Sequence, residues 1–107
     1  MWIKVCGQDE LPEGKALSLN HEELEIGVFH TEDGIYAIDN ICPHVSAELH
    51  YGVVKDGRVA CPFHGWKFKL DDGACEMHHK FNTTVFPVKT EAQAIWVDVA
   101  GGVIKSD

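Results

Sequence analysis

The sequence predicts an all-β fold of short antiparallel strands. Several stretches alternate polar and apolar residues with the two-residue period of a half-buried strand. Asp33-Gly34 and Asp56-Gly57 provide turn signals between them. No stretch before residue 40 has the period of an amphipathic helix. The 107 residues correspond to one domain, so we expect residues 1–107 to form a single unit.

The first part of the chain predicts an antiparallel meander. In the strand expected at 24–30, Leu24, Ile26 and Val28 share one face. It pairs back through the hairpin turn at 31–34, where Asp33-Gly34 would supply positive φ angles. The strands that we expect here are 2–6, 15–19, 24–30 and 35–39, separated by turns at 9–14, 20–23 and 31–34.

The middle of the chain is irregular and rich in turn-forming residues. A hairpin turn at 55–58 would fold the chain back, so that the loops 42–48 and 61–66 meet. In the second loop, Gly65 would allow a close backbone approach. Residues 40–75 are therefore predicted to form a small subdomain inserted into the β domain. Short strands are expected at 53–54, 59–60 and 67–70.

The last part of the chain predicts a return to the β domain. After a loop at 77–82, we expect a strand at 83–90, in which Pro87 indicates an edge or a bulge. A second strand at 95–99 would pair back onto it. Residues 103–107 would form a further short strand or a tail.

Two short motifs carry the chemistry: Cys42-Pro43-His44 and Cys61-Pro62-Phe63-His64. Each offers one thiol and one imidazole, whereas a zinc finger usually pairs Cys with Cys and His with His. A two-iron site can sort such mixed pairs, with both thiolates on one iron and both imidazoles on the other. That is the ligand set of a Rieske [2Fe–2S] centre. A structural zinc site and four unrelated residues are the alternatives.

At these residues the sequence resembles the Rieske iron–sulfur proteins, whose pattern is Cys-x-His, a spacer and Cys-x-x-His. The resemblance covers nearly the whole chain, residues 2–99. It implies an antiparallel β-sandwich or barrel with a two-loop cluster-binding subdomain at its tip. It also implies that Cys42 and Cys61 bind the inner iron, and that His44 and His64 bind the outer iron at the surface.

Departures from the respiratory members of the family are informative. Ala47 and Phe63 stand where those proteins carry a pair of disulfide-bonded cysteines. Trp66 and Phe68 stand where they carry a serine and a tyrosine that bond to cluster sulfurs. Such hydrogen bonds stabilise the additional electron and raise the reduction potential. Because Trp66 and Phe68 have no hydroxyl group, we expect a reduction potential at the low end of the Rieske range. This resembles the ferredoxins and oxygenases of bacterial aromatic-ring dioxygenation.

The chain length separates these two possibilities. An oxygenase needs a further catalytic domain, with a mononuclear iron bound by two histidines and a carboxylate. We do not expect 107 residues to supply that domain, and this length matches a free Rieske-type ferredoxin. We expect instead a Rieske-type ferredoxin without catalytic residues: a one-electron carrier, not an enzyme. It would take electrons from a reductase and pass them to an oxygenase or a similar redox enzyme. The alternatives are the small subunit of an assimilatory nitrite reductase or of another oxidoreductase complex, and a structural zinc protein.

Composition limits the partners and the location. The formal net charge is −8, from 17 acidic and 9 basic residues, which argues against nucleic acid and suits a partner with a basic patch. No apolar run has the length of a membrane span, and the first residues lack the pattern of a signal peptide. We therefore expect a cytoplasmic monomer that binds no membrane.

The remaining cysteines and histidines are expected to be structural or solvated. Cys6 would be a small buried strand residue, and Cys75, after a turn, would be half-buried. A disulfide between Cys6 and Cys75 stays open from sequence, although a cytoplasmic location disfavours it. Five histidines lie outside the motifs, in predicted turns or strand ends, and most of them are expected to be solvated surface residues: His21, His30, His50, His78 and His79.

Overall fold

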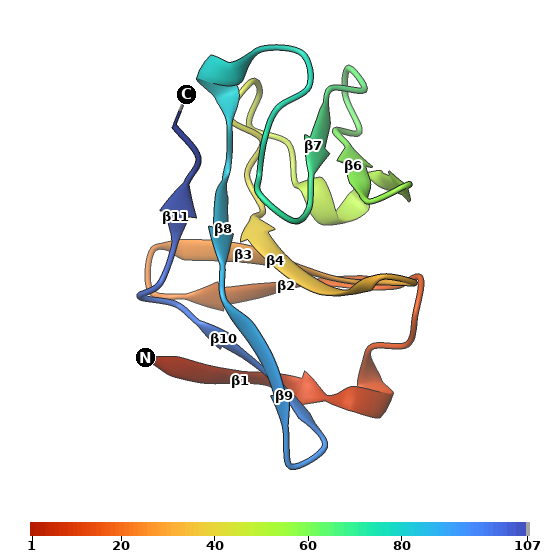
Figure 1. The fold of residues 1–107 in the computed structure, drawn as a ribbon, viewed down its shortest axis with the longest axis vertical. Coiled ribbons are helices and arrows are strands. Elements are labelled where there is room, and N and C mark those ends of the chain that lie inside the picture. Colours follow the sequence, from red (N-terminus) through yellow and green to blue (C-terminus); the bar gives the residue numbers. More distant parts are fainter. Residues whose placement is uncertain (107) are drawn as a thin grey trace.

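The computed structural model describes residues 1–106, which fold into three antiparallel sheets (Figure 1). A five-stranded sheet has the order β11-β8-β4-β3-β2, and a three-stranded sheet has the order β1-β10-β9. The third sheet, β5-β6-β7, lies at the other end of the molecule (green, upper right in Figure 1). The predicted all-β antiparallel fold is confirmed. Within residues 1–106 no closed barrel forms. The five-stranded sheet and the β1-β10-β9 sheet instead pack as a sandwich, which is the base of the molecule.

The strands agree with the expected segments to within a few residues, apart from one strand that is divided. Their bounds are β1 Trp2–Gly7, β2 Ala16–His21, β3 Leu24–Thr31, β4 Gly34–Asp39, β5 Val53–Lys55, β6 Arg58–Ala60, β7 Lys67–Lys69, β8 Thr84–Phe86, β9 Val88–Glu91, β10 Ala94–Asp98 and β11 Val103–Ile104. Within residues 1–106, three short 3₁₀ helices lie in the connections: η1 Gln8–Glu10, η2 Leu49–Tyr51 and η3 His79–Phe81. No helix in residues 1–106 has the length and apolar content that crossing a bilayer requires.

The meander is shorter than the sequence predicts. Strands β2, β3 and β4 pair in succession, with Thr31 opposite Gly34 in the hairpin. The positive φ angle predicted for this turn falls on Gly34 alone. Strand β1 leaves the meander and pairs with β10 near the other end of the chain, and the N-terminal amine lies 2.6 Å from an Asp98 carboxylate oxygen.

The strand expected at 83–90 is divided at Pro87. Before it, β8 pairs with β4 and β11, and after it, β9 pairs with β10. Because proline lacks the N–H that a ladder requires, it ends one run of pairing. Pro87 is therefore the point at which the chain passes from one sheet to the other, rather than an edge or a bulge in a single strand.

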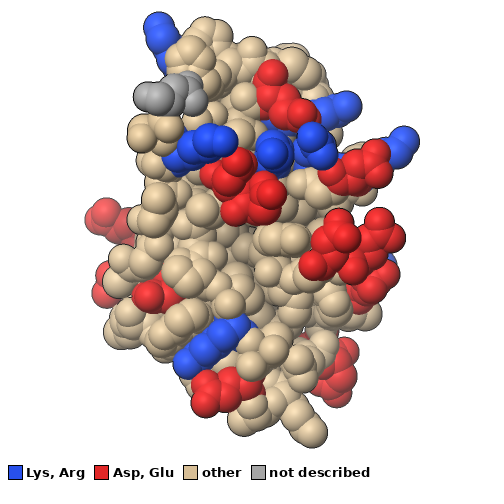
Figure 2. Space-filling view, viewed as in Figure 1, with Lys and Arg blue, Asp and Glu red and all other residues tan. Residues whose placement is uncertain are grey.

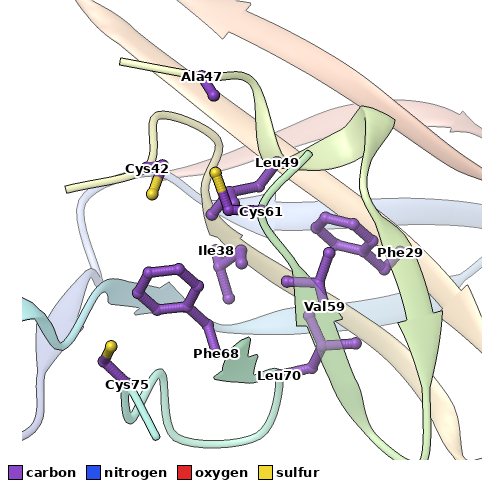
Figure 3. Packing of buried hydrophobic residues seen from close by; sticks show 10 residues of the cluster. All are labelled: Phe29, Ile38, Cys42, Ala47, Leu49, Val59, Cys61, Phe68, Leu70 and Cys75. Atoms are coloured by element: carbon purple, nitrogen blue, oxygen red, sulfur yellow. The ribbon is translucent and has the colours of Figure 1, made fainter. Parts of the chain in front are cut away.

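The five-stranded sheet lies between two hydrophobic cores, because its strands β3 and β4 carry buried residues on both faces. Successive residues Val28 and Phe29 of β3 enter different cores, as do Ala37 and Ile38 of β4, because adjacent side chains point to opposite faces. The basal core, between the two large sheets, contains Leu11, Ile26, Val28, Ala37, Phe86, Ile95, Val97 and Val99. The apical core, beneath the predicted ligand loops (Figure 3), contains Phe29, Ile38, Cys42, Ala47, Leu49, Val59, Cys61, Phe68, Leu70 and Cys75.

Candidate metal centre

The two predicted ligand loops meet at the end of the molecule that carries the β5-β6-β7 sheet. The first loop follows β4, and the second connects β6 to β7. The hairpin turn between β5 and β6 has φ angles of 53° at Asp56 and 75° at Gly57, which are those of the predicted tight turn. This hairpin folds the spacer back, as the sequence predicts, and both motif cysteines enter the apical core.

Backbone hydrogen bonds close the first loop at its base. The Cys42 N–H donates to the Ala47 carbonyl oxygen at an N···O distance of 2.9 Å. The Leu49 N–H donates to the Asn40 carbonyl oxygen at 2.7 Å. Ile41 also pairs with Glu48 as an isolated bridge. The loop is thus a small hairpin whose ends are fixed on both sides of the ligand segment.

A buried amide fastens this hairpin to the sheet. Asn40 is fully buried, and its Nδ2 donates to Glu25 Oε2 at 2.6 Å and lies 2.8 Å from His50 Nδ1. Its Oδ1 accepts the His50 N–H at 2.8 Å. One side chain therefore joins β3, the end of β4 and η2. His50 is therefore an exception among the five histidines, most of which are expected to be solvated surface residues.

The second loop is a tight turn. The Cys61 N–H donates to the Trp66 carbonyl oxygen at 2.7 Å, and the Gly65 N–H donates to the Cys61 carbonyl oxygen at 2.9 Å. Gly65 has a φ of 72°, and a Cβ built on it would meet no atom within 4 Å. Glycine is needed there for its left-handed conformation, not for the close backbone approach that the sequence suggests.

The two thiols lie together inside the protein. Cys42 and Cys61 are each 2% exposed, and their side chains are within hydrogen-bonding reach of each other (Figure 3). Burial raises the pKa of the Cys42 thiol above its usual value, and the neighbouring Cys61 thiol adds to this. The backbone N–H groups of Val45 and His44 bond to the Cys42 sulfur and act in the opposite direction, lowering that pKa.

The two motif imidazoles form a second pair. The ring centroids of His44 and His64 are 5.3 Å apart, with an angle of 70° between the planes. His64 is exposed, whereas His44 is half-buried and its Nδ1 is a buried atom without a hydrogen-bond partner. A buried nitrogen without a partner costs free energy unless something binds it. A bond to a metal would satisfy it, so the residues present fit the predicted metal centre.

The ligand types are sorted into like pairs rather than gathered into one set. The thiols contact each other, and the imidazoles contact each other. Two metal ions with two protein ligands each match this arrangement, and this is the division predicted for a two-iron centre.

Aromatic rings enclose one of the two imidazoles. The Trp66 ring is stacked on His44, with centroids 3.7 Å apart and planes 6° apart. Phe81, from η3, meets both rings edge-on, at centroid distances of 6.1 Å from His44 and 5.4 Å from Trp66. Trp66 therefore packs inward, while Phe63 is 67% exposed. Sequence reasoning missed Phe81, because nothing in the loop 77–82 marks it as a neighbour of the motifs.

The remaining cysteines take no part in this centre. All four cysteines are free, so Cys6 and Cys75 form no disulfide. Cys6 packs against the basal core but is half-buried, which is less than predicted, while Cys75 lies in the apical core. Cys75 is more buried than predicted, at 6% exposed, and Figure 3 shows its sulfur apart from the thiol pair. His30 is also more than a solvated residue, since its Nδ1 lies 2.7 Å from the Leu11 carbonyl oxygen.

Known proteins similar to this chain agree on its family. A family model described as "Rieske [2Fe-2S] domain" matches residues 1–90. The ferredoxin component of a naphthalene 1,2-dioxygenase system from Pseudomonas aeruginosa is 32% identical over 100 residues, which cover 92% of this chain and 96% of that protein.

Solved structures show the same fold. A chain from a complex of reduced oxygenase and oxidized ferredoxin in carbazole 1,9a-dioxygenase is 26% identical, with a TM-score of 0.85, covering 99% of this chain and 97% of that one. A putative NADH-dependent nitrite reductase small subunit from Mycobacterium tuberculosis also gives a TM-score of 0.85, over 99% of this chain and 97% of that chain. At 24% identity, this second likeness shows the fold alone.

Proposed function

The chain belongs to the Rieske [2Fe–2S] family, and from that premise we propose that it is a ferredoxin, a one-electron carrier that serves partner enzymes and is not itself an enzyme. The cofactor of this family is a [2Fe–2S] cluster, which sets aside the structural zinc alternative. When bound, the cluster accepts and releases a single electron.

We propose that Cys42 and Cys61 hold one iron and that His44 and His64 hold the other. The observation that carries this proposal is the pair of buried thiols beside a pair of imidazoles, one of which has a buried nitrogen without a partner. Residues 40–75 would then form the cluster-binding subdomain of a single domain. No residue of the chain is assigned a catalytic role.

The surroundings of the thiols suit a centre that gains negative charge. The N–H groups of His44 and Val45 at the Cys42 sulfur stabilise such charge without any hydroxyl. Phe68 and Leu49 are both fully buried in the same core and keep water away from the sulfurs. The thiol side of the site is therefore closed, and a partner must approach from the imidazole side.

The partners that we propose are a reductase as donor and an oxygenase or similar redox enzyme as acceptor. In support, the relatives include a dioxygenase ferredoxin component and a structure of a ferredoxin with an oxygenase. His64 is exposed, and Phe63 beside it places an apolar ring in solvent, with centroids 6.5 Å apart. An apolar patch next to a redox centre suits a small and transient contact.

Charge also favours a basic partner. The net charge is −8, and Figure 2 shows acidic side chains in separate groups on one face, densest along its right-hand side, with most of the basic side chains of this face in its upper part. Long-range attraction of this kind raises association rates and weakens as salt is added. We propose that the protein is a cytoplasmic monomer that meets its partners by such encounters.

The test of the cofactor is chemical and spectroscopic. The purified protein should be coloured, contain about two irons and two sulfides per chain, and take up one electron on reduction. His44→Ala and His64→Ala should abolish or badly damage the centre. His21→Ala, at the end of β2, is the matched control and should keep it. A colourless, folded protein loaded with zinc would show the proposal to be wrong.

The test of docking uses transfer rates to a cognate oxygenase. Phe63→Ala should slow transfer while leaving the spectrum unchanged, and reversing the charge of the exposed Glu48 should alter the salt dependence of the rate. Met77→Ala, which removes another exposed apolar side chain, provides a comparison. If neither the Phe63 nor the Glu48 variant changes the rate or its salt dependence, docking at this tip is wrong.

A further inference from the structure

The two imidazoles proposed as ligands occupy unequal environments. His64 is exposed, and its ring is steeply inclined to the neighbouring rings of His44 and Phe63, at 70° and 89°. His44 is half-buried, and one of its faces lies flat against the Trp66 ring. A pair of ligands that is equivalent by residue type is therefore not equivalent in packing.

The stack on His44 is held from a third segment of the chain. Phe81 meets both rings of the stack edge-on, which is a favoured geometry for aromatic contacts. The position of Phe81 is fixed by the next residue, since Asn82 Oδ1 accepts the Cys75 N–H at 2.9 Å and its Nδ2 donates to the Lys105 carbonyl oxygen at 3.1 Å. The loop 77–82 thus braces the two ligand loops against each other.

We propose that Trp66 is a positioning residue for His44. Its indole fixes the plane of the imidazole with Nδ1 directed into the protein, and it excludes water from that ligand. This inference rests on the proposed function, because it assigns His44 to the iron. The consequence is a division of labour, in which His44 is the shielded ligand and His64 is the one that partners can reach.

The expected direction of the effect on potential follows from charge. The negative charges of two thiolates offset the positive charge of an oxidised [2Fe–2S] core. The reduced form, with one more electron, therefore carries the greater net charge, which is negative. Low-dielectric surroundings disfavour the more highly charged form, and water admitted beside His44 would favour it. Removing the indole should therefore shift the midpoint potential to a more positive value, and it should leave the His44 ring less well ordered.

The test compares Trp66→Ala, Trp66→Phe and Trp2→Ala in the holoprotein. Trp2 is 38% exposed on β1 and serves as the matched control. Trp66→Ala should lose its visible absorbance under a chelator about tenfold faster than wild type, as expected for the loss of an aromatic contact. It should also show a more positive potential and a changed nitrogen coupling from one histidine in pulsed EPR. Trp66→Phe should restore most of each value, and Trp2→Ala should match wild type.

The outcomes separate this inference from the proposed function. A wild-type protein without a Rieske centre overturns the proposed function itself. A normal wild-type centre, with Trp66→Ala unchanged in nitrogen coupling, potential and chelator sensitivity, overturns the positioning role alone. If Trp66→Ala does not fold, Phe81→Leu decides the matter, because it keeps Trp66 but removes the ring that contacts both members of the stack. A changed nitrogen coupling and potential in Phe81→Leu support the inference, and wild-type values of both overturn it.

Discussion

Replacing Asn40 with alanine should destabilise the protein through the base of the first ligand loop. The change removes three side-chain contacts of a fully buried amide, two with His50 and one with Glu25. Leaving a buried donor or acceptor without a partner costs about 1–3 kcal/mol. Because Glu25 and His50 are half-buried and can regain water, we expect a total loss of about 2–4 kcal/mol. For a domain of this size that lowers the Tm by roughly 10–20 °C.

The assay is thermal unfolding followed by circular dichroism at one scan rate, with visible absorbance recorded in parallel. Asn20→Ala, which removes the same side chain at an exposed position of β2, is the control and should change the Tm little. Asn40→Asp adds a second test, since at neutral pH it places a carboxylate against that of Glu25. Its stability should rise as the pH is lowered and one carboxyl group takes up a proton. A Tm for Asn40→Ala within a few degrees of wild type would refute this reasoning.

Three further changes test other parts of the site. We expect a wild-type midpoint potential on the order of −150 mV, and Phe68→Tyr should raise it, because a hydroxyl near the buried thiols stabilises added negative charge. Electrochemistry gives both potentials, and a wild-type potential above zero would contradict the expectation. Gly65→Ala should cost about 1–2 kcal/mol in urea unfolding, since its φ is 72°, and an unchanged urea midpoint would show that the turn relaxes. Burial raises the pKa of the Asp39 carboxyl, and this effect outweighs the hydrogen bond from the Ile41 N–H, which lowers the pKa. Ionisation of Asp39 therefore opposes folding at neutral pH. Asp39→Asn should therefore be more stable than wild type at pH 7, with the gain vanishing below the unfolded pKa of about 4, and a gain independent of pH would point to another cause.

The sequence was informative where the signal is local. The period-two alternation predicted β2, β3 and β4 with their pairing, and Asp56-Gly57 predicted the hairpin that brings the ligand loops together. The two motifs predicted that thiols and imidazoles would meet, and the structure brings them together as like pairs. Each of these features depends on residues close together in the chain or on the chemistry of the side chains themselves.

What the sequence did not show depends on distant parts of the chain. The pairing of β1 with β10 joins Trp2 to Asp98, and nothing in either strand specifies that partner. The sequence predicts that Pro87 marks an edge or a bulge within one strand, but the chain changes sheet there, and a change of sheet is a property of the sandwich and not of the proline. Phe81 approaches His44 only because the loop 77–82 returns across the site. For the same reason the environment of Trp66 could not be decided from its motif.

The position of the site depends on the base of the molecule through β3 and β4. Phe29 and Ile38 contribute to the apical core beneath the thiols, while their neighbours Val28 and Ala37 contribute to the basal core. Because these residues lie on two strands shared by both cores, neither strand can shift without disturbing both. The packing of β3 and β4 in both cores therefore fixes the position of the ligand loops relative to the sandwich. The exposed tip of these loops at Phe63 is not held by this packing. Substitutions at the tip should therefore alter partner encounters without altering the centre, and substitutions in β3 and β4 should alter both.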